Sequence, residues 1–460
     1  MVFSSLTFLL LFLPVSLGIY YLVPMKAKNA VLVAVSLIFY AWGEPIYVLL
    51  MIYSILMNYG MGRLMEKENA LKKPILVFTV FLNLLMLGFF KYSGFLVTNV
   101  NRLLPENLRL TVREIKLPIG ISFYTFQALS YIIDLYRGKF KAQRNLIRFA
   151  AYITMFPQLI AGPIVRYEEV ERQLTERTIT LERFGRGMLR FICGLGKKVL
   201  LANTAGVVFD TARGLTDASA VGAWLGTAGY AFQIYFDFSG YSDMAIGLGQ
   251  MLGFDFAENF DYPYISASVT EFWRRWHISL GTWFKEYVYI PLGGNRVSTA
   301  RHVLNLMIVW LLTGIWHGAG WTFLLWGLYY GILLILDKYL FSRLKIPRAL
   351  GIAGTMLLVL FGWVLFSSDG LSDALRTYGQ MIGIGVPFVT DGAVYTLLRS
   401  CVLLVIEILA CLPLMKKVYR KITKARAGQI VMTVAVAAVL LLSIVFLVTE
   451  NYNPFLYFRF

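Results

Sequence analysis

His317 is the side chain in this sequence best suited to moving a proton. It lies in the long apolar stretch 310–321 (WLLTGIWHGAGW). An ionisable group in such surroundings is costly unless it has a function or a partner. Because the unperturbed pKa of histidine is about 6.5, His317 suits general-base chemistry at neutral pH. Gly314, Gly318 and Gly320 would let a neighbouring helix or a substrate approach closely. The structural alternative is a buried histidine hydrogen-bonded across helices.

A second histidine, His277, lies in an aromatic and basic stretch, 271–285 (EFWRRWHISLGTWFK). Pro263 precedes this stretch and Pro291 follows it, which predicts a helix of about six turns between the two breaks. The stretch suits an interfacial helix whose cations reach lipid headgroups. A second interpretation is a cytoplasmic-side site for an anionic donor, whose phosphates would be bound by Arg274, Arg275, Lys285 and Arg296.

Two carboxylates interrupt another apolar stretch, 235–243 (YFDFSGYSD). A charge inside a membrane usually faces a cavity or an oppositely charged partner. One interpretation is a polar reaction chamber, and the other is a pair of structural ion pairs or helix caps. The side chains expected to line such a chamber are Asp237, Ser239, Asp243, Trp273, Trp276 and Trp316.

The remaining histidine and the three cysteines suggest no further chemistry. His302 follows Arg301 at a charged helix edge, where we expect it to be solvated. Cys193, Cys401 and Cys411 lie in apolar runs and form no CxxC pair. Neither a disulfide framework nor a metal site is therefore predicted.

The elements that position these residues must be membrane helices. Of the 460 residues, 58% are hydrophobic, whereas soluble domains contain about 45–50%. The net charge is +17, but the basic residues fall in short loops between apolar runs. This distribution is typical of the positive-inside bias and argues against nucleic-acid binding.

Fourteen apolar segments are candidate membrane crossings, of which eleven to thirteen are expected to span. The rest would be re-entrant or broken helices, which are tolerated where protein or a water-filled cavity surrounds them. The first segment reads as a spanning helix and not as a cleavable signal peptide. The candidates are 6–23, 29–42, 46–61, 74–97, 117–134, 146–165, 187–207, 220–236, 241–257, 303–316, 319–337, 350–366, 393–413 and 428–448.

Charged loops predict the orientation. Six cations and no acid occur in 416–426, so this loop is expected in the cytoplasm, as is 338–349. The acidic loop 367–392 between them is expected outside. Counting spans from these loops places 258–302 on the cytoplasmic side, the turn near His317 toward the outside, and the C-terminal tail outside.

The segments 273–277 (WRRWH) and 316–318 (WHG) resemble those of the membrane-bound O-acyltransferase (MBOAT) family, in particular its alginate O-acetyltransferase type, with the teichoic-acid D-alanyl transferase as a relative. The resemblance implies an all-α polytopic fold, a ring of about 11–13 transmembrane helices with re-entrant segments around a central tunnel. It implies one domain over 1–460, with a helical core at about 100–340, C-terminal helices at 350–448 and an extracytoplasmic tail at 449–460. Further segments that carry it are 3–5 (FSS), 40–43 (YAWG), 156–163 (FPQLIAGP), 235–243 (YFDFSGYSD) and 291–296 (PLGGNR).

The resemblance also implies an activity. His317 matches the family's catalytic histidine and His277 its second histidine. An acyl group, acetyl in this subgroup, would pass from a cytoplasmic thioester to an extracytoplasmic polysaccharide or cell-wall polymer. The donor would be acetyl-coenzyme A or an acyl carrier protein thioester, with no bound cofactor. The expected partners are membrane lipid, an SGNH-type protein and the polysaccharide, and the expected location is the bacterial inner membrane.

The last residues, 453–460 (NPFLYFRF), resemble the C-terminal motif of a small protein that works beside the D-alanyl transferase. By this resemblance Tyr457 is a candidate acyl carrier. The alternative is an aromatic anchor at the membrane interface. Alternatives for the whole chain are a D-alanyl or lipid O-acyltransferase of the same family and, more remotely, a secondary transporter with broken helices.

Overall fold

The computed structural model describes residues 1–67, 69–112, 115–160, 162–449 and 456. Within these residues the chain is helical or irregular, without a strand, which confirms the all-α prediction. The chain forms two compact units. The first consists of residues 1–191 and 244–257, and the second of residues 192–243 and 258–460.

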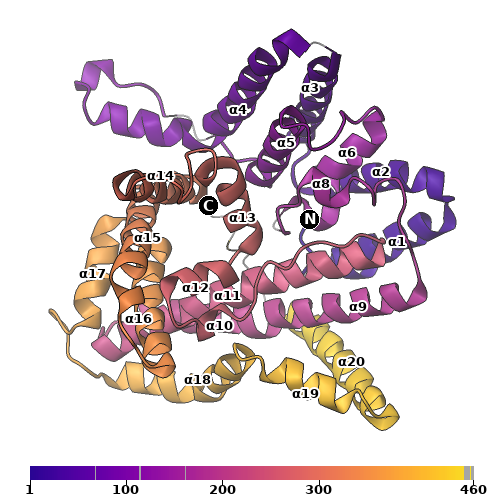
Figure 1. Cartoon of the computed structure of the whole chain (residues 1–460). Helices are drawn as coiled ribbons and strands as arrows, with labels where there is room; N and C mark the ends of the chain where they lie inside the picture. Colours follow the sequence, from indigo (N-terminus) through magenta and orange to yellow (C-terminus); the bar gives the residue numbers. More distant parts are fainter. Residues whose placement is uncertain (68, 113–114, 161, 450–455, 457–460) are drawn as a thin grey trace. The chain divides into compact units, whose positions relative to one another are not determined.

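The first unit contains the N-terminal helices, among which α4 packs on α3 and α5 (Figure 1). Two helices contribute residues to both units: α9, which continues past residue 191, and α11 (Ala220–Met251), whose residues from 244 onward belong to the first unit. The elements are η1 Phe8–Phe12, α1 Leu13–Leu22, α2 Met25–Gly43, α3 Val48–Lys67, η2 Asn69–Leu71, α4 Lys72–Asn101, η3 Glu106–Leu108, α5 Ile121–Tyr136, α6 Leu146–Thr154, α7 Phe156–Leu159, α8 Tyr167–Val170 and α9 Leu181–Gly196.

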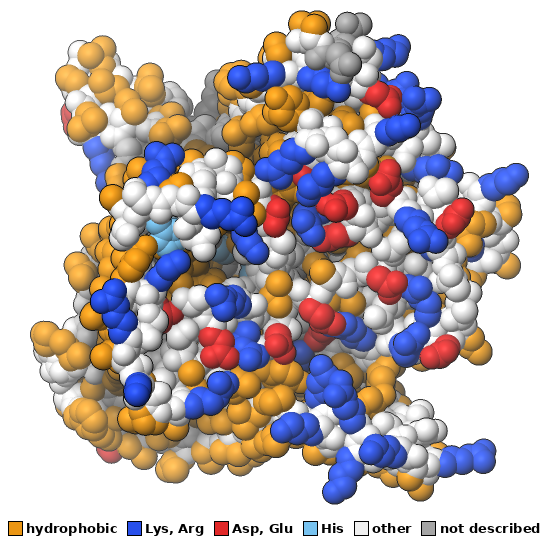
Figure 2. Space-filling view, in the orientation of Figure 1, with side chains coloured by type: hydrophobic (Ala, Val, Ile, Leu, Met, Phe, Trp, Pro, Cys, Tyr) orange, Lys and Arg blue, Asp and Glu red, His pale blue; other side chains and the backbone are white. Residues whose placement is uncertain are grey.

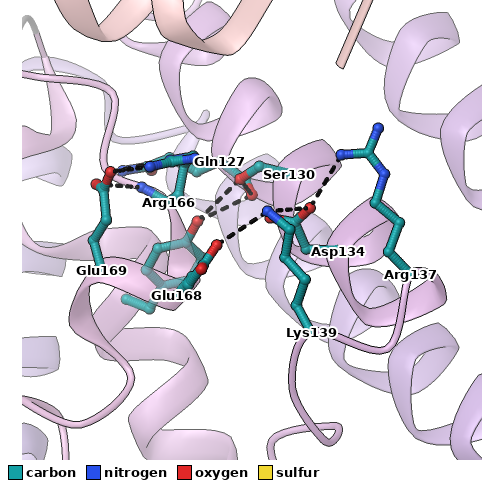
Figure 3. Close-up of polar contacts among 9 residues, drawn as sticks. Gln127, Ser130, Asp134, Arg137, Lys139, Arg166, Glu168 and Glu169 are labelled. Carbon is teal, nitrogen blue, oxygen red and sulfur yellow. Dashed lines mark hydrogen bonds and ion pairs between the residues drawn. The ribbon is translucent and has the colours of Figure 1, made fainter. Parts of the chain in front are cut away.

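A polar cluster fixes the end of α5 in the first unit (Figure 3). The Asp134 side chain is only 1% exposed and forms ion pairs with Arg137 at 3.4 Å and Lys139 at 3.2 Å. Lys139 also contacts Glu168 on α8 at 3.0 Å. Because a buried carboxylate is costly without opposite charges, these pairs hold the turn after α5 against α8.

In the second unit α14, α15 and α16 lie side by side (Figure 1). Residues 263–289 form a series of short helices between the long helices α11 and α14. The elements are η4 Lys197–Ala202, α10 Asn203–Arg213, α11 Ala220–Met251, η5 Pro263–Ile265, α12 Val269–Arg275, α13 Ile278–Phe284, η6 Lys285–Tyr289, α14 Thr299–His317, α15 Trp321–Tyr339, η7 Phe341–Arg343, α16 Arg348–Ser367, α17 Leu371–Met381, α18 Asp391–Ala410, α19 Leu414–Ile422 and α20 Arg426–Thr449.

The structure corrects three helix predictions. The expected spans 220–236 and 241–257 are one continuous helix, α11, because Gly240 is accommodated within it by close packing against Gly194. Segment 146–165 breaks into α6 and α7 at Met155, just before Pro157. The six-turn helix between the two prolines is also wrong, because His277 adopts left-handed backbone angles and separates α12 from α13.

Eight of the described helices are long and apolar enough to cross a membrane, fewer than the eleven to thirteen expected. The difference arises partly because α5 has only 16 residues and the segment of α6 and α7 is interrupted. The most apolar crossing is α20, whose side chains are largely exposed, as expected for a lipid-facing helix. Figure 2 shows Lys and Arg side chains gathered over the neighbouring α19, within the loop predicted to be cytoplasmic.

Candidate active site

Close packing of two helices positions His317. A Cβ added to Gly314 on α14 would lie 3.1 Å from the Cα of Gly327 on α15, and one added to Gly327 would lie 3.2 Å from the Cα of Gly314. The helices can therefore approach this closely only because both residues are glycine. α14 ends at His317, where Gly318 is extended, so the histidine occupies the last turn next to α15.

Aromatic rings surround His317. Its ring meets those of Trp316, Trp326 and Phe366 edge to face, at centroid distances of 5.0, 5.0 and 5.2 Å. Only 7% of the residue is exposed. Such a wall holds the imidazole in one orientation and excludes bulk water, which strengthens electrostatic interactions with a bound substrate.

Two cavities of the second unit share His317 and Trp276 in their walls. The larger has a volume of about 450 Å³ and is also lined by Trp273, Arg274 and Lys285. The smaller has a volume of about 20 Å³, room for about one water, and is also lined by Asp237 and Leu456. His317 is thus accessible from both cavities, and a group bound in either one can contact its ring.

The predicted donor-binding cations separate into different environments. Arg274 and Lys285 are exposed and line the larger cavity. Arg275 instead forms ion pairs with Asp261 at 3.1 Å and Glu271 at 3.0 Å. Arg296 is exposed and is not among the residues that line the described cavities.

Glu271 explains why Arg275 is held in place. Although burial alone would raise it, the pKa of the Glu271 carboxyl lies below its usual value because it accepts the Ala267 N–H and faces Arg275 and Arg348. The carboxylate therefore stays charged and binds Arg275, one turn further along α12.

His277 is buried and has defined partners. Its Nδ1 lies 3.2 Å from Oδ1 of Asn259, which also accepts the backbone N–H of Ser279 at 3.1 Å. Because that N–H can only donate, the Asn259 atom is an oxygen, and Nδ1 of His277 must carry the proton. Burial lowers the pKa of His277 to about 3, so the ring is neutral at physiological pH. Its ring centroid lies 6.1 Å from that of Trp316.

The expected chamber-lining residues are only partly brought together. Trp273 and Trp276 line the larger cavity, Trp276 and Asp237 line the smaller one, and Trp316 contacts the rings of both histidines. Ser239 is buried and Asp243 pairs with Lys197 at 2.6 Å, but neither is among the residues lining the described cavities. Tyr457 lies outside the described residues.

Three features of the site were not predicted. Leu456 reaches the small cavity from the far end of the sequence, and Lys198 forms a buried ion pair with Asp237 at 2.8 Å. The expectation that His302 is solvated is wrong, because this residue is buried between the hydroxyls of Tyr289 at 2.8 Å and Tyr339 at 2.7 Å. Long-range packing creates all three features, and the only sequence signal was the position of Lys198 in an apolar run.

Comparison with known proteins decides between an acyltransferase and a transporter. The model of the membrane-bound O-acyltransferase family matches residues 75–371, a range that contains both His277 and His317. This chain belongs to the MBOAT family. It is therefore a multi-pass membrane protein and an O-acyltransferase, as the resemblance predicted, and the secondary-transporter alternative is dropped.

Several known proteins are similar to this chain over half of its length or more. The probable alginate O-acetylase AlgI of Pseudomonas putida is 43% identical, covering 100% of both chains. The peptidoglycan O-acetyltransferase of Helicobacter pylori is 34% identical over 100% of this chain and 98% of its own. The teichoic acid D-alanyltransferase of Bacillus subtilis is 28% identical over 54% of this chain and 68% of its own.

Proposed function

We propose that this O-acyltransferase moves an acetyl group from a cytoplasmic thioester donor across the bacterial inner membrane, for O-acetylation of an extracytoplasmic polysaccharide or cell-wall polymer. The observation that carries the proposal is the wall shared by two cavities. His317 and Trp276 line the larger cavity, which has cations, and the smaller cavity, which contains Leu456. A donor in the first and an acceptor group in the second would both contact His317.

The donor we propose is acetyl-coenzyme A or an acyl carrier protein thioester. Both carry phosphate, which suits the exposed guanidinium of Arg274 and ammonium of Lys285 at the larger cavity. The apolar surface contributed by Trp273 and Trp310 would contact the rest of the donor's arm. The names of the alginate and peptidoglycan relatives support acetyl as the group and a polymer as the final acceptor.

Tyr457, which follows Leu456 in the sequence, is the proposed first acceptor. Its phenol oxygen would attack the thioester carbonyl carbon while His317 takes the phenol proton. The carbon–sulfur bond would break, the leaving thiolate would take that proton, and an aryl ester would remain on Tyr457. A base is needed because a phenol with a pKa near 10 is a poor nucleophile at neutral pH (about 0.1% ionised). A serine hydroxyl of an SGNH-type partner would then attack the ester, and the phenol would regain its proton.

The test follows radiolabelled acetyl groups on purified protein in lipid nanodiscs. The label is supplied on coenzyme A or on an acyl carrier protein, and Tyr457→Phe is the matched variant because it removes only the hydroxyl. We expect the wild type to acquire a base-labile label and to pass it to an SGNH-type partner, and the variant to do neither. Equal transfer by Tyr457→Phe overturns the carrier role, and failure to cleave either acetyl thioester overturns the acetyltransferase proposal.

A further inference from the structure

A buried ion pair lies next to the last described residue of the chain. The Lys198 ammonium is 2.8 Å from the Asp237 carboxylate, and the two side chains are only 2% and 4% exposed. The other carboxylate oxygen of Asp237 accepts the backbone N–H of Leu456 at 3.0 Å. Lys198 also donates to Oδ1 of Asn203 at 2.8 Å. The Asp237 carboxylate on α11 therefore contacts both Lys198 of η4 and the backbone of Leu456.

The local structure around this pair is specialised. Lys198 belongs to η4, a π-helical turn between α9 and α10, and such turns occur frequently at functional sites. Gly240 on α11 packs against this turn, since a Cβ there would lie 3.0 Å from the backbone nitrogen of Lys198. The close approach brings Lys198 to Asp237, one turn earlier on α11. A charged pair inside apolar helices is expensive and marks a functional site by default.

The position of Leu456 connects the pair with the site of chemistry. Leu456 is 5% exposed and lines the small cavity together with His317, Ile234 and Asp237. A buried backbone N–H needs an acceptor, and Asp237 supplies one at the edge of this cavity. We propose that Lys198 and Asp237 are positioning residues that hold Leu456 in the small cavity beside His317.

The ion pair and the hydrogen bond have separate roles in this arrangement. Lys198 orients the Asp237 carboxylate through the 2.8 Å ion pair, and a carboxylate oxygen is a stronger acceptor for an N–H than a neutral group. The Leu456 side chain then covers the small cavity and excludes water from that face of His317. The proposal rests on the proposed function only for its effect on catalysis, because the seating of Leu456 can be measured without any acyl transfer.

The experiment measures how accessible position 456 is, as the rate of maleimide labelling of Leu456→Cys. The three native cysteines of this chain are replaced by alanine. The clamp variant is Lys198→Met with Asp237→Leu, since replacing both partners by apolar residues of similar volume largely preserves folding. The matched control is Lys197→Met with Asp243→Leu, which removes the 2.6 Å ion pair between the same two helical segments without touching Leu456. Leu456→Pro is a second variant that removes the N–H donor and the leucine side chain, and also restricts the backbone at this position. Leu456→Ala controls for the loss of the side chain.

We expect slow labelling in the otherwise unchanged chain and in the control, and labelling at least about tenfold faster in the clamp variant. His317→Ala should remain protected although it transfers nothing, which separates this inference from the proposed function. In kinetic assays the clamp variant and Leu456→Pro should lose about 10²-fold in kcat, typical of a small misplacement of a reacting group, with the donor KM unchanged. Equal labelling of clamp variant and control, or full activity of Leu456→Pro, would overturn the inference.

Discussion

The two units contain buried polar regions of opposite kinds. In the first unit the charges face one another: Asp134 faces Arg137 and Lys139, and Arg166 binds Glu169 at 2.8 Å (Figure 3). In the second unit His317 is surrounded by aromatic rings and faces two cavities. A closed set of charges stabilises the fold, whereas a titratable group at a cavity wall is available to a substrate. The first region is therefore expected to control stability and the second to control rate.

The largest effect on rate is expected from His317→Ala. Removing a general base lowers the rate by about 10²–10⁴-fold, so the rate of acyl transfer should fall at least about 100-fold. Expression and thermal stability should change little, because the neighbouring aromatic side chains can move into part of the space that the imidazole ring leaves. Transfer of labelled acetyl to acceptor, measured beside a melting curve of the same preparation, checks both. A well-folded His317→Ala protein with full activity would remove the distinction between the two regions.

The opposite behaviour is expected from Arg137→Gln combined with Lys139→Gln in the first unit. Both substitutions leave the 1% exposed Asp134 without its two cations. Breaking a buried pair on one side typically costs about 3–5 kcal/mol, so the thermal midpoint should fall strongly. The folded fraction should keep the wild-type donor KM and kcat. A fall in kcat of folded protein with no loss of stability would contradict a structural role for this cluster.

The sequence predicted the type of fold and singled out His317 as a candidate, but it did not predict the surroundings of that histidine. His317 stood out because an ionisable group in a long apolar stretch is rare. The break at His277 was missed because its left-handed conformation depends on Asn259, a partner 18 positions away. Lys198, Asp237 and Leu456 meet only through packing of distant segments, which periodicity in one segment cannot reveal.

The larger cavity offers a test of which cations bind the donor. Arg274→Gln with Lys285→Gln removes the two cations that line it, so the donor KM should rise about tenfold or more while kcat changes little. The reason is that phosphate contacts hold the donor equally in the ground and transition states. Steady-state kinetics with acetyl-coenzyme A and with acetylated carrier protein measure the change.

Arg275→Gln is the matched control for that experiment. It removes one cation from the same helix, but one that is paired with Asp261 and Glu271. Its donor KM should stay near the wild-type value, and its main effect should be a modest loss of stability. If Arg275→Gln raised KM as much as the double variant, it would be wrong to assign donor binding to Arg274 and a structural role to Arg275.

The smallest expected effect concerns pH and His277. Its pKa is about 3 in the folded protein because of burial, against about 6.5 in an unfolded chain. Below pH 6.5 the unfolded state therefore binds a proton that the folded state does not. As the pH is lowered below 6.5, the free energy of unfolding should therefore decrease by up to about 1.4 kcal/mol per pH unit because of this residue alone. Above pH 6.5 the contribution is fully present and constant.

His277→Asn isolates this contribution. Asparagine tolerates left-handed backbone angles, and its amide can replace the Nδ1–H that His277 donates to Asn259. Since asparagine does not titrate, the thermal midpoint of the variant should fall less between pH 7 and pH 5 than that of the wild type, while the two proteins differ little at pH 7.5. Melting curves across this interval, compared as a difference between the two proteins, remove the contribution of all other titrating groups. Parallel curves would mean that the His277 ring, which lines the larger cavity together with His317, is solvated and able to accept a proton.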